Sequence, residues 1–218
     1  MRPKLLDLFC GAGGAAMGYY RAGFDVVGVD IKPQPRYPFE FVQDDVTTWD
    51  ALDISKGRYD AIHASPPCQF YTVAKNNGSC QKAVDLVPWT LALLRSQDAP
   101  WIVENVAGAP LPSAIQLCGA SFGLGTGEFD LNRHRYFETN FGLLAPPCQH
   151  RRGQTVGVYG NGTNSYHRAK FGRCVRAIEL REAMGIDWMN RKELSQAIPP
   201  AYTEWIGTRL MELLQRVA

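Results

Sequence analysis

Short apolar runs that end in glycine or in a polar side chain recur through the first half of this chain, and they constrain its fold more than any other feature. The runs that predict β-strands cover 4–9, 25–30, 39–43, 59–62 and 101–103. Between them, helical segments are indicated over 14–21 and 84–94. Strands that alternate with helices predict an α/β fold, a doubly wound parallel sheet covered on both faces.

The residues that follow these strands are the candidates for chemistry, because ligands bind at the carboxyl ends of strands in open parallel sheets. The glycine-rich segment 10–14 follows the first strand, where backbone can approach a ligand closely. Asp30 ends the second strand, about twenty residues downstream, a position from which a carboxylate can hold ribose hydroxyls. Asp45 follows the third strand, and Glu104 and Asn105 follow the fifth.

Cys68 stands just after the fourth strand, because two prolines before it prevent the strand from continuing. A thiol in this position is a candidate nucleophile, and a buried structural cysteine is the alternative. The same letters, Pro-Pro-Cys-Gln, recur at 146–149, but only Cys68 follows an apolar strand. Cys148 and His150 could offer two metal ligands. Since nothing supplies the usual other two at a sensible spacing, we expect no metal site.

Length and composition predict an ordinary globular protein. A chain of 218 residues, 45% hydrophobic and 20% charged, suits one domain with a small appended lobe. The six cysteines are scattered without a Cys-x-x-Cys pair, which argues against a disulfide framework and a zinc ribbon. The sequence has neither a signal-peptide core nor an apolar stretch of membrane-spanning length. We expect a monomer in a reducing cytoplasm, with no membrane partner.

The net charge of +2 is too small to imply a nucleic-acid partner, but the charges are unevenly distributed. No acidic residue occurs between Glu138 and Glu179. The cations in this interval that we expect to contact phosphates are Arg151, Arg152, Arg168, Lys170 and Arg173. A block of one sign repels itself unless an anion is present, so we favour a phosphate partner over a solvated loop.

We expect two parts in the chain. A catalytic and cofactor-binding domain covers 1–142 and is completed by the C-terminal helix, 196–218. Residues 143–195 form a small basic recognition lobe, whose first part is rich in Gly, Pro, Asn and Arg and therefore in loops. The pattern is weaker after Gly108, where we expect a short helix over 114–123 and a strand over 133–141.

Four segments give the chain a family resemblance. In order, they are Asp7-Leu-Phe-Cys-Gly-Ala-Gly-Gly14, Pro66-Pro-Cys-Gln69, Glu104-Asn-Val106 and Arg133-His-Arg135. Together they resemble the motif series of the cytosine-5 DNA methyltransferases, and 181–186 and 196–200 are similar to the closing motifs of that family. The short form is most similar to phage-encoded members. The resemblance implies a Rossmann-like methyltransferase sheet that uses S-adenosylmethionine.

The resemblance also implies catalytic roles. Because C5 of cytosine is a poor nucleophile, the Cys68 thiolate would first add to C6. Glu104 would supply a proton at N3 of the base. Asn105 would lock the Pro66–Cys68 turn through its amide. Arg133 and Arg135 would bind O2 of the base and help position the nucleophile.

By the same resemblance the cofactor-binding residues are Phe9, Gly11, Gly13, Asp30, Ile31, Asp45, Val46, Pro67 and Gln196. Phe9 would stack on the adenine, and Ile31 and Val46 would wall it. Asp30 would hold the ribose and Asp45 the adenine amino group, although capping of strand ends is the ordinary alternative. Two positions depart from the family: Leu131 replaces a Gln, and Gln196 replaces the Asn expected at the cofactor.

DNA is the partner that the resemblance implies. A base inside a duplex does not expose C6, so the target would be flipped into the site. Gln69 and Lys75 would contact nucleic acid from the loop that closes over it. The recognition lobe is much shorter than in sequence-specific members, which favours a very short target or help from a partner protein. Two alternatives remain at this point: an RNA methyltransferase of the transfer-RNA-directed branch, whose Cys-Phe-Thr signature is not obvious here, and a non-catalytic nucleic-acid-binding protein.

Overall fold

The structure is a computed structural model, and it describes residues 1–50, 54, 59–71, 84–127, 129–150, 154–160, 168 and 172–217. Four residues that we expected to contact nucleic acid lie outside the described residues: Lys75, Arg151, Arg152 and Lys170. Within the described part of the chain, no helix is both long and apolar enough to cross a membrane.

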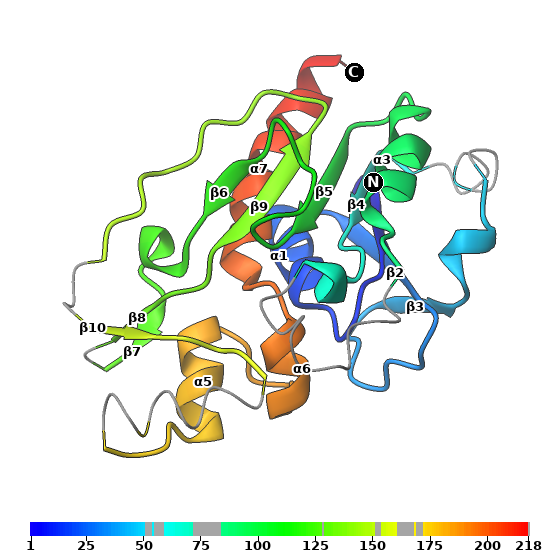
Figure 1. The fold of residues 1–218 in the computed structure, drawn as a ribbon. Coiled ribbons are helices and arrows are strands. Elements are labelled where there is room, and N and C mark those ends of the chain that lie inside the picture. The colour runs from blue at the N-terminus through cyan, green and yellow to red at the C-terminus, as the bar shows by residue number, and fades with distance from the viewer. Residues whose placement is uncertain are drawn as a thin grey trace.

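A seven-stranded sheet in the order β3-β2-β1-β4-β5-β9-β6 forms the centre of the fold (Figure 1). Five strands are parallel: β1 (Lys4–Leu8), β2 (Asp25–Asp30), β3 (Glu40–Gln43), β4 (Ala61–Ala64) and β5 (Trp101–Asn105). The antiparallel pairings are made by β9 (Arg135–Thr139), which lies between β5 and β6 (Ile115–Leu117). The prediction of an α/β, Rossmann-like sheet is confirmed.

Helices cover both faces of this sheet, as the apolar side chains of β1 show, because they pack in two different clusters. The side chain of Leu5 packs in one apolar cluster with α1 (Gly14–Ala22) and α7 (Pro200–Val217). Leu6 and Leu8 pack in a second cluster with α3 (Val87–Arg95). Because successive side chains of a strand point to opposite faces, the two clusters lie on opposite sides of the sheet.

Helices α1 and α7 approach each other closely, because glycine lies at the contact. A Cβ atom on Gly18 would lie 2.1 Å from both the Pro200 carbonyl oxygen and Thr203 Oγ1. The Thr203 hydroxyl donates to the carbonyl oxygen of Ala15 at 2.8 Å. The last described helix therefore completes the core around the first.

A second, three-stranded sheet lies beside the main one in the order β10-β8-β7 (Figure 1). Its strands are β7 (Gly125–Thr126), β8 (Phe129–Leu131) and β10 (Gln154–Val156). It shares an apolar cluster with α5 (Ala177–Met184) and α6 (Arg191–Gln196). Since β7 and β8 come from the part that we assigned to the catalytic domain, the expected boundary at residue 142 does not coincide with the start of this sheet. The division into 1–142 with 196–218, and 143–195, stays a prediction.

The expected helix over 114–123 is wrong. The segment forms β6 and then a 3-10 helix, η4 (Gly119–Phe122). Gly119 allows close packing here, because a Cβ atom on it would lie 2.6 Å from Cβ of Leu131. Gly123 ends the turn with a φ of 67°. These backbone requirements prevent a regular helix, and the apolar pattern alone did not reveal them.

Candidate active site

Cys68 lies directly after β4, as predicted, and begins a 3-10 turn, η2 (Cys68–Phe70). The backbone N–H of Tyr71 donates to the Cys68 carbonyl oxygen at 2.9 Å and closes this turn. The Asn105 amide nitrogen, in β5, donates to the carbonyl oxygen of Pro66 at 2.9 Å. This contact ties the cysteine-bearing turn to the neighbouring strand.

Glu104 and Arg135 form a buried ion pair beside this turn. Arg135 Nε lies 3.0 Å from Glu104 Oε1, and the two side chains are only 10% and 8% exposed. Burial raises the pKa of Glu104 above its ordinary value, while the charges of Arg135 and Arg133 oppose the rise. Burial and the Glu104 charge raise the pKa of the Cys68 thiol, and Arg135 opposes that rise too. The acid, the guanidinium and the thiol therefore act on one another electrostatically.

Arg133 makes contacts different from those of Arg135. Its side chain is fully buried, and its Nε and Nη2 donate to the carbonyl oxygens of Ala197 and Ser195 at 2.9 and 3.0 Å. Its Nη1 donates to the carbonyl oxygen of Val158. Each nitrogen of the guanidinium group thus already donates a hydrogen bond to a backbone carbonyl oxygen. Arg133 connects the segment before β9 to the residues that follow β10 and to the end of α6. The contact of Arg133 and Arg135 with the base stays a prediction.

A hydrogen-bonded chain leads to Glu104 from the interior, and sequence reasoning missed it. The Tyr19 hydroxyl lies 3.0 Å from His63 Nδ1, and His63 Nε2 lies 2.8 Å from the Ser65 hydroxyl oxygen. Ser65 in turn hydrogen-bonds Glu104, which lowers the pKa of the acid against the larger effect of burial. Burial lowers the pKa of His63 to about 3, so its imidazole is neutral. The one feature of the sequence that could have indicated this chain of hydrogen bonds is His63, a histidine within an apolar strand.

A cavity of about 420 Å³ opens beside Pro67, within the roughly 300–1,000 Å³ typical of small-molecule sites. Its lining residues are Phe9, Asp30, Ile31, Asp45, Val46, Thr47, Pro67, Val84 and Leu86. The structure therefore brings together most of the residues expected at the cofactor. Gly11, Gly13 and Gln196 are not among the lining residues. Thr47, Val84 and Leu86 were missed, since nothing in their sequence context marks them.

The two carboxylates of this cavity are fixed by local hydrogen bonds. Asp30 accepts from the backbone N–H of Gly11 at 3.0 Å, which places the glycine-rich turn against the cavity. Asp45 accepts from the backbone N–H of Thr47 at 3.0 Å and from its hydroxyl at 2.7 Å. The hydroxyl bond and the backbone bond lower the pKa of Asp45. Phe9 holds an unusual φ of 59°, which directs the chain out of β1 into the turn.

The described residues that we expected to contact nucleic acid differ in their exposure and in their partners within the protein. Gln69 lies on η2 and is exposed, next to the candidate nucleophile. Arg168 is exposed, and its Nη2 donates to the Cys174 sulfur at 3.4 Å. Arg173 forms an ion pair with Glu179 at 2.8 Å, so its charge is partly compensated within the protein.

The family model of the C-5 cytosine-specific DNA methylases matches residues 3–112, half of the chain. M.HgiGI, a type II methyltransferase of Herpetosiphon aurantiacus, is 30% identical over 126 residues, which cover 52% of this chain and 98% of that protein. The chain belongs to the C-5 cytosine-specific DNA methylase family. Another type II methyltransferase, M.AgeI of Thalassovita gelatinovora, is 27% identical over 120 residues, or 48% of this chain and 28% of that protein. The match with this C-5 methylase thus covers less than a third of the length of M.AgeI.

Solved structures agree with the fold of this C-5 methylase. The Dnmt2 methyltransferase of S. pombe aligns with a TM-score of 0.67 over 98% of this chain and 99% of that one. Its sequence identity is 14%, so this likeness concerns the fold alone.

Proposed function

We propose that this C-5 methylase transfers a methyl group from S-adenosylmethionine to C5 of cytosine in DNA, through a transient bond between the Cys68 sulfur and C6 of the base. The observation that carries the proposal is the buried Glu104–Arg135 pair at 3.0 Å, on β5, which pairs with β4, and on β9, the next strand of the sheet. A proton donor and a cation next to a thiol suit activation of a pyrimidine ring. A protein that only binds nucleic acid needs no such set.

The cavity beside Pro67 fits the methyl donor. Phe9, Ile31 and Val46 offer an aromatic ring and aliphatic walls for an adenine. The carboxylates of Asp30 and Asp45 can accept hydrogen bonds from hydroxyl and amino groups. When bound, the cofactor supplies an electrophilic methyl group on a positively charged sulfur.

The chain's own residues prepare the base. The Cys68 thiolate adds to C6, and the electron pair of the C5–C6 double bond moves toward C5 and the ring. In its protonated form, Glu104 donates its proton to N3, and the carboxylate that remains carries part of the negative charge that develops on the ring. The Arg135 cation stabilises O2 and the carboxylate that Glu104 becomes. Once C5 carries the methyl group, its proton leaves to a solvent base, N3 returns its proton to Glu104, and the S–C6 bond breaks with its electrons on sulfur.

DNA is proposed as the substrate because the matching family and the curated relatives are named for DNA methylation or as type II methyltransferases. The target cytosine has to leave the base stack, since a paired base does not expose C6 to a thiol. Gln69 follows the nucleophile directly and is exposed, which supports a contact with the flipped nucleotide or its neighbours.

The test measures transfer from labelled S-adenosylmethionine to mixed-sequence duplex DNA and, in parallel, to transfer RNA. We expect label in DNA, loss of it in Cys68→Ser, and wild-type incorporation in Cys174→Ser, which changes a cysteine outside the site. Label in transfer RNA alone would replace the substrate proposed here by RNA. An absence of label in both polymers would contradict the enzyme proposal.

The covalent step has a separate test. DNA that contains 5-fluorocytosine has no C5 proton to lose, so the bond to C6 should persist after methyl transfer. We expect a denaturation-resistant protein–DNA adduct that peptide mass spectrometry assigns to Cys68. An adduct on Cys148, which has the same flanking residues, would show that the wrong cysteine was chosen.

A further inference from the structure

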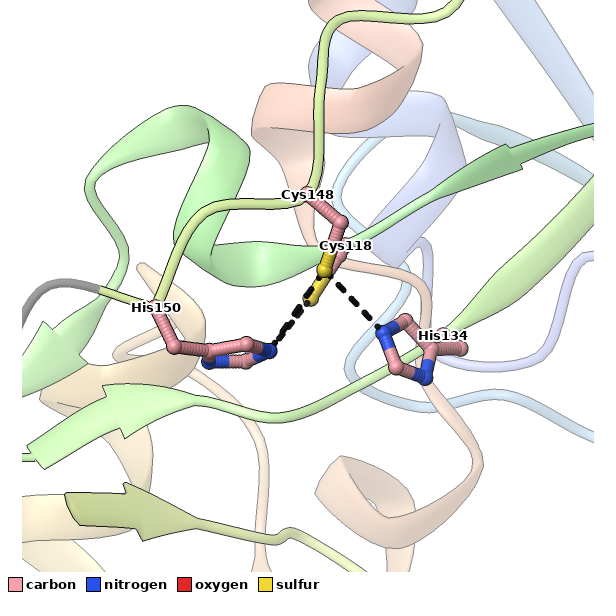
Figure 2. Close-up of side chains that lie close together, drawn as sticks. All are labelled: Cys118, His134, Cys148 and His150. Atoms are coloured by element: carbon pink, nitrogen blue, oxygen red, sulfur yellow. Dashed lines mark hydrogen bonds between the residues drawn. The ribbon is translucent and has the colours of Figure 1, made fainter. Parts of the chain in front are cut away.

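Four potential metal ligands converge at the far edge of the main sheet: Cys118, His134, Cys148 and His150 (Figure 2). One sulfur or nitrogen atom from each lies within 4.8 Å of all the others. Cys118 is buried, His134 is half-buried, and the other two are exposed, so the group lies at the surface with one ligand anchored in the core.

Three of the four sulfur–nitrogen distances in this group match those around a tetrahedral ion. His134 Nε2 lies 3.4 Å from Cys148 Sγ, and His150 Nε2 lies 3.5 Å from the same sulfur and 3.6 Å from Cys118 Sγ. Zinc bonds of about 2.3 Å to sulfur and about 2.0–2.1 Å to nitrogen, at tetrahedral angles, place sulfur and nitrogen about 3.6 Å apart. The spacing needed for a shared ion is therefore already present.

The orientation of the side chains agrees with a shared centre. Figure 2 shows the rings of His134 and His150 approaching the two sulfurs from opposite sides. Their planes lie at 80° to each other, with centroids 6.2 Å apart. Both rings present Nε2 to sulfur, so the same nitrogen of each is available to a metal.

Backbone polar groups surround the Cys118 sulfur, and its thiol donates to the carbonyl oxygen of Leu131 at 3.8 Å. The backbone N–H groups of Ala120 and Arg133 face its sulfur as hydrogen-bond donors. Such donors to a ligating sulfur are typical of the outer contacts that orient metal ligands and stabilise their charge. The Cys118 side chain is 1% exposed, which fixes its position without any ion.

We propose that these four residues bind one zinc ion in a closed structural site. Two sulfurs and two imidazoles favour zinc over the harder cations that prefer oxygen. Binding releases one proton from each thiol, so two thiolates balance the charge of the ion. With four protein ligands no position is left for water or substrate, and the ion is structural. The expectation of no metal rested on two absent ligands, which the fold supplies from Cys118 and His134.

The ion would connect three parts of the chain. Cys118 follows β6, His134 precedes β9, and the other two ligands lie in the irregular segment 142–150. A hydrogen bond also links that segment to this edge, since the Ser121 hydroxyl donates to the Pro147 carbonyl oxygen at 2.9 Å. Because His134 stands between Arg133 and Arg135, zinc would also brace the arginine-bearing turn beside the active site. The binding itself does not depend on the proposed reaction.

Metal content of the full chain, purified under reducing conditions, tests the proposal. We expect about one zinc per chain, lost in Cys148→Ser and in His150→Gln, and kept in Cys174→Ser. Wild-type chain without stoichiometric zinc that also fails to take up added zinc would overturn the proposal. Equal loss of zinc from Cys174→Ser would do the same, because that cysteine lies outside the cluster.

Cobalt substitution tests the geometry without relying on a variant that folds poorly. Co²⁺ added to metal-free wild-type chain should give intense tetrahedral absorption in the visible range and a sulfur-to-metal charge-transfer band. His150→Gln should alter the first signal, and Cys148→Ser should reduce the second by about half, since one of two sulfur ligands is removed. An octahedral spectrum in the wild type, or a disulfide between Cys118 and Cys148 in reduced preparations, would contradict the assignment.

Discussion

The chain uses the tetrapeptide Pro-Pro-Cys-Gln twice, at 66–69 and at 146–149, and the two cysteines have different neighbours. Around Cys68 the charges are those of a buried carboxyl group and a guanidinium, at the carboxyl end of a central strand. Around Cys148 lie two imidazoles and a second thiol at the sheet edge, with no carboxylate in the group. The first environment suits a reaction with a bound base, and the second suits a soft cation. Identical local sequence therefore leaves the role of the thiol to tertiary structure.

Exchanging each cysteine for serine separates the two sites most strongly. Cys68→Ser should lower methyl transfer at least about a thousandfold, since it removes the nucleophile, and should keep its zinc. Cys148→Ser should lose the ion and its stabilisation, about 4 kcal/mol at a thousandfold excess of zinc over Kd. For a chain of this size that corresponds to a fall of about 8–16 °C in Tm. Calorimetry and label transfer on both variants check this, and two variants with the same profile would break the distinction.

Glu104→Gln should lower the rate of methyl transfer about a hundredfold or more, because it removes the proton donor at N3. Burial raises the pKa of Glu104, so the neutral acid persists to higher pH than for an exposed glutamate. The wild-type rate should fall as pH rises through that pKa, and the same deprotonation should destabilise the folded state, since a charge forms in a buried site. The variant should lack this pH dependence in both readouts. Retention of the alkaline limb in the variant would assign it to another group.

The two arginines of the Arg133–Arg135 turn should differ in what they control. Arg133→Gln leaves one buried and two part-buried carbonyl oxygens short of donors, and we expect a loss of about 2–4 kcal/mol in the free energy of unfolding. Arg135→Gln should act mainly on kcat, with a smaller change in stability. Denaturant unfolding and steady-state rates measure the two effects. A reversed pattern would return the base contact to Arg133.

Ser65→Ala should give the smallest change, less than about tenfold in rate. The Ser65 hydrogen bond lowers the pKa of Glu104, so its removal should raise that pKa further. The alkaline limb of the rate profile should then move to higher pH, while Tm changes little. A shift to lower pH would mean that the chain from Tyr19 through His63 acts in another way.

Much of the main sheet could be predicted, because strand ends and apolar periodicity are local properties of sequence. The carboxylates of the cavity and Cys68 were placed by the same reasoning, since each stands at or shortly after the end of a strand. The group of four candidate metal ligands could not be found this way: Cys118 lies 32 residues before His150, and it meets His134 only because β9 pairs with β6. The structural role of Arg133 could not be predicted either, because its hydrogen-bond partners are backbone carbonyl oxygens, and a side-chain pattern contains no information about them.

The contact between α1 and α7 has a consequence for how the chain folds during its synthesis. The Thr203 hydroxyl reaches a carbonyl 188 residues earlier, and the buried ring of Tyr19 shares its apolar cluster with α7. While a ribosome is still making the second half, the face of α1 that α7 covers has no partner. Contacts between segments so distant in sequence slow folding, because closing the long loop between them costs entropy before the contact itself contributes stability. The glycine-rich turn in front of α1 is made well before α7, yet it gains its full support only when that helix arrives.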